Sequence, residues 1–193
     1  MKIIGVGCGP GLLTVEAIRE LKKARFVYGS DRAIELARSY LPEHCTVRSI
    51  DDYKNLATLP DNAVILSTGD PMLAGLGYLR GEVIPGISSL QIAAARLHIP
   101  LSRIIVVVAH GRGHEQGMRD TVEEVKRKKI VFLLPDPKFD VTELYRRLAA
   151  LNVPLQVGVC ENLAYPDERI VVGTIASPPR PNAPLYSLLI GDF

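Results

Sequence analysis

Glycines and small polar residues follow an apolar run near the start of the chain, in the stretch IIGVGCGPGLLT at residues 3–14. Glycine lets backbone approach a ligand closely, and the helix expected after this stretch begins with N–H groups that have no partner inside the helix. A strand, a tight glycine-rich turn and a helix N-terminus are typical of a ligand-binding loop. The chemistry that this loop offers is binding and orientation through backbone groups.

The spacing of these glycines argues against a dinucleotide ligand. The fingerprint G-x-G-x-x-G requires a third glycine five residues after the first. Starting from Gly5, Gly7 or Gly9, that position holds proline, leucine or threonine. Pro10 also lacks an N–H group that a phosphate would accept. A nicotinamide-dependent oxidoreductase is therefore a disfavoured alternative, and a non-catalytic binding module is another, because the chain shows no unmistakable nucleophile.

Two later stretches have the same construction. The apolar run at residues 63–67 ends in TGDP at 68–71, and the run at 82–84 ends in PGISS at 85–89. Turn and helix-cap chemistry would explain each stretch by itself. In a parallel sheet, however, ligands lie at the carboxyl ends of the strands. Three such loops at one edge of a sheet predict a pocket.

The strand–helix alternation restarts after a further strand at residues 104–108, which ends in AHGRGH at 109–114. This restart predicts an α/β fold with two domains, residues 1–109 and 110–193, and a ligand cleft between them. Helices are expected at residues 12–23, 31–40, 72–79, 90–97, 120–129 and 140–151. The last strands lack a long crossover helix, so we expect mixed or antiparallel pairing there.

Composition excludes several classes of protein. The 193 residues carry a net charge of only +2, include no tryptophan and are 47% hydrophobic, which disfavours a nucleic-acid-binding protein and a disordered chain. The three cysteines show no metal-binding spacing, so we expect no metal site and a reducing cytoplasm. We expect no membrane segment, because no apolar run approaches the length of a bilayer span.

Taken together, the motifs resemble those of the tetrapyrrole methylase family. VGCGPGLLT at residues 6–14 is similar to its G-x-G-P-G-x-x-x-T loop, STGDP at 67–71 to its G-D-P motif, and IPGISS at 84–89 to its P-G-[IV]-[ST]-[SA] motif. PGISSLQ, the HGR triplet at residues 110–112 and the short length are most similar to the CbiE-type branch. Those enzymes methylate carbon-5 of precorrin-7 or cobalt-precorrin-7. Relatives that act on uroporphyrinogen or diphthamide are the alternative within the family.

The resemblance implies two αβα domains, a homodimer and S-adenosylmethionine bound in the cleft. It also implies that carbon-15 methylation and decarboxylation belong to a separate protein, since the sequence ends at Phe193. Leu134 stands where relatives often carry methionine. The cofactor contacts that the resemblance implies are Pro10, Thr68, Gly69, Asp70, Met72, Ser88, Ser89, Leu134, Ala164, Pro184 and Leu185.

The proposed acceptor bears many carboxylates, and arginine binds a carboxylate through two parallel hydrogen bonds. Arg112 is therefore the predicted substrate-binding residue, with His110 beside it. Methyl transfer itself needs positioning more than covalent help. A proton must leave the nucleophilic carbon. His110 and Glu161 are the two candidate bases, and the sequence does not choose between them.

Overall fold

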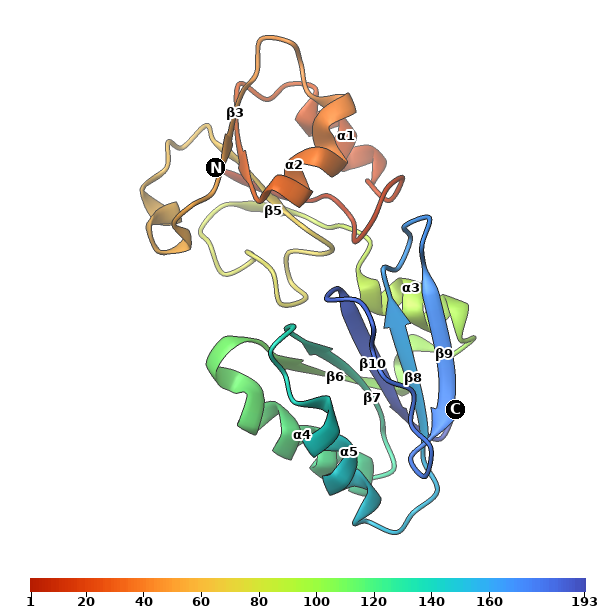
Figure 1. Ribbon diagram of the computed structural model, residues 1–193. Helices are drawn as coiled ribbons and strands as arrows, with labels where there is room; N and C mark the ends of the chain where they lie inside the picture. The colour runs from red at the N-terminus through yellow and green to blue at the C-terminus, as the bar shows by residue number, and fades with distance from the viewer. The chain divides into compact units, whose positions relative to one another are not determined.

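The computed structural model describes residues 1–193, apart from the side chain of Arg112. The chain divides into two compact units, Met1–Ser89 and Leu90–Phe193, each with its own sheet (Figure 1). This division lies earlier in the chain than the predicted boundary between residues 109 and 110. The reason is that β6 (Ile104–Ala109) pairs with β7 (Ile130–Pro135) in the second sheet, so the residues from Leu90 onward belong to the second unit.

The first unit is built on five parallel strands in the order β3-β2-β4-β1-β5. Helices α1 and α2 cover one face of this sheet, while the short 3-10 helix η2 and the turns before β5 cover the other. The elements are β1 (Lys2–Gly5), α1 (Val15–Leu21), β2 (Phe26–Gly29), α2 (Asp31–Ala37), η1 (Arg38–Tyr40), β3 (Thr46–Ser49), η2 (Tyr53–Thr58), β4 (Val64–Ser67) and β5 (Glu82–Ile84).

Hydroxyl side chains start both helices of the first unit. The Thr14 Oγ1 atom accepts the Ala17 N–H at 3.1 Å, and Ser30 Oγ accepts the Ala33 N–H at 3.2 Å. Each bond satisfies one of the N–H groups that a helix leaves unpaired at its first turn. Ser30 is thus the N-cap of α2, and Asp31 is its first helical residue.

The helix predicted at residues 72–79 does not form, and this stretch is a series of turns. The Leu76 N–H donates to Ser67 Oγ at 3.3 Å, and the Gly77 N–H donates to the Pro71 carbonyl at 2.9 Å. A Cβ at Gly75 or Gly77 would come within 3.0 Å of Pro71, so these two glycines permit a fold-back that a helix would not. Two glycines in eight residues also weaken helix propensity.

The second unit has the strand order β6-β7-β10-β8-β9. β6 and β7 are parallel, whereas β10 runs antiparallel to both β7 and β8, and β9 antiparallel to β8. This confirms the expected mixed region. The further elements are α3 (Ser89–Arg96), η3 (Leu101–Arg103), η4 (Gly111–Gly113), α4 (His114–Lys126), α5 (Val141–Ala149), β8 (Gln156–Glu161), β9 (Arg169–Thr174) and β10 (Tyr186–Gly191).

Successive residues along the strands of the second sheet point to its two opposite faces, and different helices cover the two faces. Leu188 and Ile190 join the core formed with α4 and α5, where Leu144 and Leu148 are fully buried. On the other face a Cβ at Gly158 would lie 3.3 Å from the side chain of Leu97, which directly follows α3. The sheet is therefore covered on both faces, as Figure 1 shows. Among the described residues, no helix is both long and apolar enough to span a lipid bilayer.

Candidate functional site

The three glycine-rich loops of the first unit lie side by side. β1 pairs with β4 on one side and with β5 on the other, so the loops after these strands share the carboxyl edge of the sheet. The Gly69 N–H donates to the Gly7 carbonyl at 2.8 Å, the Gly7 N–H returns a 3.3 Å bond to Gly69, and the Cys8 N–H donates to the Ile87 carbonyl at 2.9 Å. The convergence predicted from the sequence is confirmed.

Glycine is required where these loops meet. A Cβ at Gly86 would lie 2.2 Å from the Gly69 carbonyl oxygen and 2.8 Å from the backbone of Gly5. At Gly5, a Cβ would lie 2.5 Å from the Gly86 nitrogen. No side chain fits in this space, so backbone packs directly on backbone across β1 and β5.

The outer part of the same loops is open. Gly11 and Gly69 have φ angles of +75° and +69°, a region that glycine adopts without strain. A Cβ at Gly11 would meet no atom within 4 Å, and one at Gly69 would meet only the Ser88 Cα, at 3.9 Å. The loops thus leave space beside bare backbone, which is the condition for a ligand to approach the main chain closely.

Asp70 joins two of the three loops. Its Oδ1 atom accepts the Met72 N–H at 2.8 Å, and its Oδ2 atom accepts the Gly86 N–H at 3.0 Å. A carboxylate has about four acceptor positions, so both oxygens retain capacity for a further donor. The carboxylate therefore fixes the distance between the β4 and β5 loops, whatever else it binds.

The other predicted cofactor residues of the first unit lie in the same loops. Pro10 is exposed, the Met72 side chain is 71% exposed, and Ser88 is buried. Thr68 directly follows β4, and Ser89 is the first residue of α3. All of these residues therefore follow the carboxyl ends of β1, β4 and β5.

The strand order also bears on the dinucleotide alternative. In a dinucleotide-binding fold, β2 lies next to β1, and an acidic residue near the end of β2 binds the ribose beside the glycine loop. Here β4 lies between β1 and β2, which separates them by about 10 Å. Asp31, the acid after β2, hydrogen-bonds to Ser49 at the end of β3. It is therefore not placed to serve the β1 loop.

The predicted residues of the second unit also share one sheet edge. His110 follows β6, Leu134 lies near the end of β7, and Glu161 ends β8. β10 runs antiparallel to β7 and β8, so its preceding residues Pro184 and Leu185 reach that same edge. The Asn162 N–H donates to the Leu185 carbonyl at 3.0 Å, and this bond joins the segment after β8 to the segment before β10. Ala164 lies just beyond, with a φ of 66°.

Glu161 is a buried carboxylate with three donors. The Arg169 guanidinium donates to its Oε2 at 2.5 Å, and Oε1 accepts the N–H groups of Asn182 and Ala183, the latter at 2.8 Å. Burial by itself would raise the pKa of Glu161, but these donors outweigh it and hold the pKa below its ordinary value. Such a carboxylate is a weak base, and its contacts hold the turn before β10 in place.

Asp136 is a functional candidate that none of the sequence motifs includes. Its Oδ2 accepts the Gly111 N–H at 2.6 Å and lies 2.9 Å from His114 Nε2, while Oδ1 accepts the Lys138 N–H at 2.8 Å. Asp136 therefore holds the backbone of the His110–Gly113 segment. Its position directly after the buried strand β7 is the signal that could have identified it.

Arg112, the predicted substrate-binding residue, belongs to η4, and its side chain lies outside the described part of the structure. His110 is exposed at the start of that segment. Elsewhere in the described chain, no group of three His, Cys, Asp or Glu side chains is placed to hold a metal ion.

Comparison with known proteins gives a consistent result. The sequence model of the family described as Tetrapyrrole (Corrin/Porphyrin) Methylases matches residues 2–179. A probable cobalt-precorrin-7 C(5)-methyltransferase of Methanocaldococcus jannaschii is 33% identical over 184 residues, which cover 86% of this chain and 85% of that protein. The cobalt-precorrin-7 C(5)-methyltransferase of Salmonella typhimurium is 25% identical and covers 88% of each chain.

Among solved structures, the cobalamin biosynthesis precorrin-6Y methylase (CbiE) of Archaeoglobus fulgidus has a TM-score of 0.77 with this chain at 26% identity. The alignment covers 100% of this chain and 97% of that one. The methyltransferase CobJ, with a TM-score of 0.83 at 17% identity, has the same fold.

Proposed function

The chain belongs to the tetrapyrrole methylase family, and from that premise we propose that it methylates carbon-5 of a precorrin or cobalt-precorrin in cobalamin biosynthesis. As a member of this family it is a methyltransferase that uses S-adenosylmethionine. The observation that carries the choice of acceptor is the 33% identical M. jannaschii relative, which is named for that reaction and aligns with most of this chain.

The residues of the first unit fit this cofactor. When bound, S-adenosylmethionine supplies an activated methyl group on its sulfonium sulfur. The open backbone at Gly11 and Gly69 leaves room for a ligand, and Asp70 holds the loops that border this space at a fixed separation. We assign cofactor binding to these loops with Pro10, Thr68, Met72, Ser88 and Ser89, and in the second unit to Leu134, Ala164, Pro184 and Leu185.

In the reaction, the acceptor carbon forms a bond to the methyl group, the sulfur–methyl bond breaks, and its electron pair stays on sulfur. The protein contributes by orienting the reactants and excluding water. We assign the proton that leaves the acceptor to the exposed His110, because Glu161 is already engaged by three donors. Arg112 is assigned to a substrate carboxylate.

The proposal also covers the assembly, the location and the partners of the protein. We propose a homodimer in the cytoplasm that works beside a separate decarboxylating carbon-15 methyltransferase, with no nucleic-acid or membrane partner. Sedimentation equilibrium tests the dimer, and a monomer at micromolar concentration would refute that part.

Calorimetric titration with S-adenosylhomocysteine tests the cofactor assignment, with NAD as the negative control. Asp70→Ala leaves the N–H groups of Gly86 and Met72 without their acceptor. The Gly86 N–H is partly buried, so its loss costs about 1–3 kcal/mol, whereas the exposed Met72 N–H can bind water instead. We therefore expect the affinity for S-adenosylhomocysteine to fall about tenfold or more.

Asp52→Ala is the matched control. Asp52 also accepts a backbone N–H, that of Lys54 at 2.8 Å, but it follows β3, which β2 and β4 separate from β1. The Asp52→Ala variant should bind S-adenosylhomocysteine with the same affinity as the wild type. Folded wild-type protein that binds no S-adenosylhomocysteine would overturn the assignment of the cofactor.

A further inference from the structure

A pocket of about 440 Å³ opens on the second unit, between the start of α5 and the segment that leads into β10. Three aromatic side chains form its floor, those of Phe139, Tyr145 and Tyr186, which are only 5%, 7% and 8% exposed. Each of the three presents only a small part of its surface, so the aromatic contact that the pocket offers comes from ring edges and faces held in place by the core. An aromatic floor favours a flat, apolar ring.

Three prolines and an asparagine also line the pocket. Pro137, Pro181 and Pro184 line it, and proline restricts the backbone before any ligand arrives. Asn182 lies between two of them, and its N–H is held by the buried carboxylate of Glu161. The pocket is therefore shaped by the fold itself, which lowers the entropic cost of binding.

Of the two tyrosine hydroxyls in the pocket, one has no hydrogen-bond partner among the described residues. Tyr145 donates its hydroxyl to the Pro179 carbonyl at 2.9 Å, so that group is already used. Tyr186 makes no hydrogen bond through its hydroxyl to any described residue, and its oxygen is not among the fully enclosed ones. Tyr186 lines the pocket, so its hydroxyl is an available donor there, although more than nine-tenths of the residue is buried.

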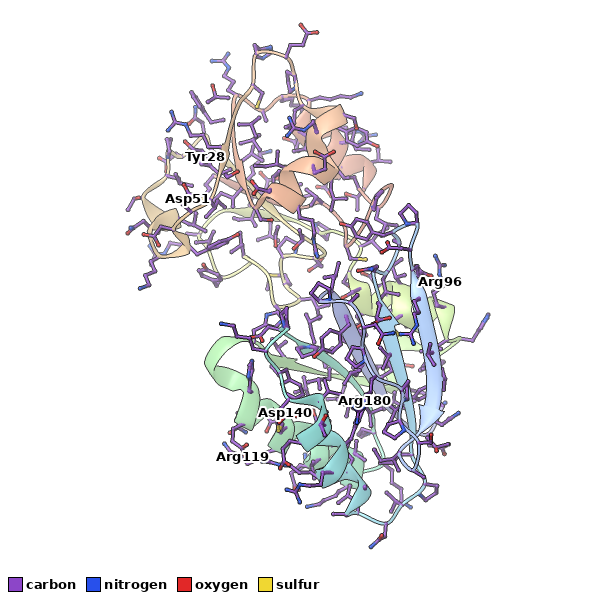
Figure 2. All side chains as sticks on the ribbon, in the orientation of Figure 1. Tyr28, Asp51, Arg96, Arg119, Asp140 and Arg180 are labelled. Atoms are coloured by element: carbon purple, nitrogen blue, oxygen red, sulfur yellow. The ribbon has the colours of Figure 1, made fainter. Side chains whose placement is uncertain are left out.

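The pocket also has one unpaired cation. Arg180 lines it and forms no ion pair with any described residue. Asp140, the acid on the other side, accepts the Glu143 N–H at 2.9 Å and lies at the positive end of α5, which offsets its charge. Figure 2 labels Arg180 and Asp140, the two charged residues of this pocket. Arg180 is exposed and its guanidinium is not held by an ion pair with a described residue, so it is available to an anionic group of a ligand.

We propose that this pocket binds one acid-bearing pyrrole ring of the tetrapyrrole substrate, with the ring on the aromatic floor and its acid side chains on Arg180 and Tyr186. The inference rests on the proposed function and adds a site to it. The volume suits a single ring with its side chains, because pockets for small ligands measure about 300–1,000 Å³. Arginine is the side chain that best matches a carboxylate, through two parallel hydrogen bonds.

Porphobilinogen, a monopyrrole with one acetate and one propionate arm, is a direct probe of this site. We expect its titration into the full chain to shift the ¹H–¹⁵N NMR signals of residues 137–145 and 180–186. Arg180→Gln should weaken binding about tenfold, and Tyr186→Phe about threefold, as the loss of a charged and a neutral hydrogen bond requires. Arg119→Gln, an exposed arginine on α4, is the matched control and should bind like the wild type.

The dimethyl ester of porphobilinogen tests the role of the acid groups and should bind at least tenfold more weakly. Absence of shifts at the pocket, equal binding of the ester, or equal affinity of Arg180→Gln and Arg119→Gln would each overturn the inference. Titration of the same samples with S-adenosylhomocysteine separates the two proposals. If the wild type does not bind S-adenosylhomocysteine, the cofactor assignment is refuted. If it binds S-adenosylhomocysteine normally but porphobilinogen shifts no signal at the pocket, only the pyrrole site is refuted.

Discussion

Asp136 links the stability of the second unit to pH. The hydrogen bond from His114, followed by that from the Gly111 N–H, lowers the pKa of Asp136 from 3.8 to about 2. A lowered pKa means that the ionised carboxylate stabilises the folded state above about pH 4, and that this contribution is lost as the pH falls toward 2. Thermal unfolding between pH 5 and 2 should therefore show a loss of stability that is smaller in Asp136→Asn. Parallel curves for the two proteins would contradict this.

At the scale of single residues, the sequence identified positions better than roles. The pattern of apolar strands predicted the loop that holds Asp70, the family resemblance predicted Asp70 itself as a cofactor contact, and the residue does lie among the three loops. Asp70 also accepts the N–H of Gly86, sixteen residues later. This contact exists because β5 pairs beside β1, and no feature of the nearby sequence indicates it. The contact of Asp136 with Gly111, twenty-five residues earlier, is equally non-local. A pairwise contact of this kind cannot be predicted from one chain without the fold.

At the scale of elements, the packing of β1 on β5 is the feature most sensitive to substitution. Gly86→Ala would place a Cβ 2.2 Å from the Gly69 carbonyl oxygen, and backbone cannot move aside as a flexible side chain can. We expect a loss of about 1–3 kcal/mol in the free energy of unfolding, together with weaker binding of S-adenosylhomocysteine. Chemical denaturation and calorimetry measure the two effects.

Gly113→Ala is the control for this prediction. A Cβ at Gly113 would meet no atom within 4 Å, and its φ of −85° suits any residue. The free energy of unfolding of the Gly113→Ala variant should lie within about 0.5 kcal/mol of the wild-type value, as for most surface substitutions. If both alanine variants are equally stable, the close approach does not constrain the first unit.

Strands were easier to predict than helices in this chain. Buried parallel strands such as β4 are continuously apolar, and turn residues bound them on both sides, so their ends are visible in the sequence. The helix expected at residues 72–79 failed because Ser67 and Pro71 capture backbone N–H groups of that stretch, which is a tertiary effect. Local propensity cannot anticipate such competition.

At the scale of the whole molecule, two buried thiols report on the two units separately. Cys8 lies in the first unit and Cys160 in the second, and burial raises the pKa of Cys160 to about 12. In a Cys45→Ser variant both thiols should be unreactive in the native state, since the thiolate is the reactive form. Each unit has its own core, so we expect the two cysteines to be labelled at different denaturant concentrations. Peptide mass spectrometry distinguishes them, and simultaneous labelling would show a single cooperative unit.

The two-unit organisation could be inferred from the restart of the strand–helix alternation, but the position of the division could not. β6 looked like the last strand of the first sheet because it follows β5 in the sequence after one helix. Its partner is instead β7, which follows it in the chain. Sequential order cannot decide between these two neighbours, because both connections pass through a helix and both are compatible with a parallel strand.

The strand orders also affect how the protein is made. β1 leaves the ribosome well before the strands that pair with it, because its neighbours β4 and β5 are complete only at residues 67 and 84. At roughly 5–20 residues per second, the nascent chain keeps this apolar strand unpaired for on the order of ten seconds. In the second sheet the wait concerns β10, because β7 and β8 are joined only when β10 arrives between them. Premature termination before residue 186 would therefore release a chain with a split sheet and two unprotected strand edges, a substrate for chaperones and proteases.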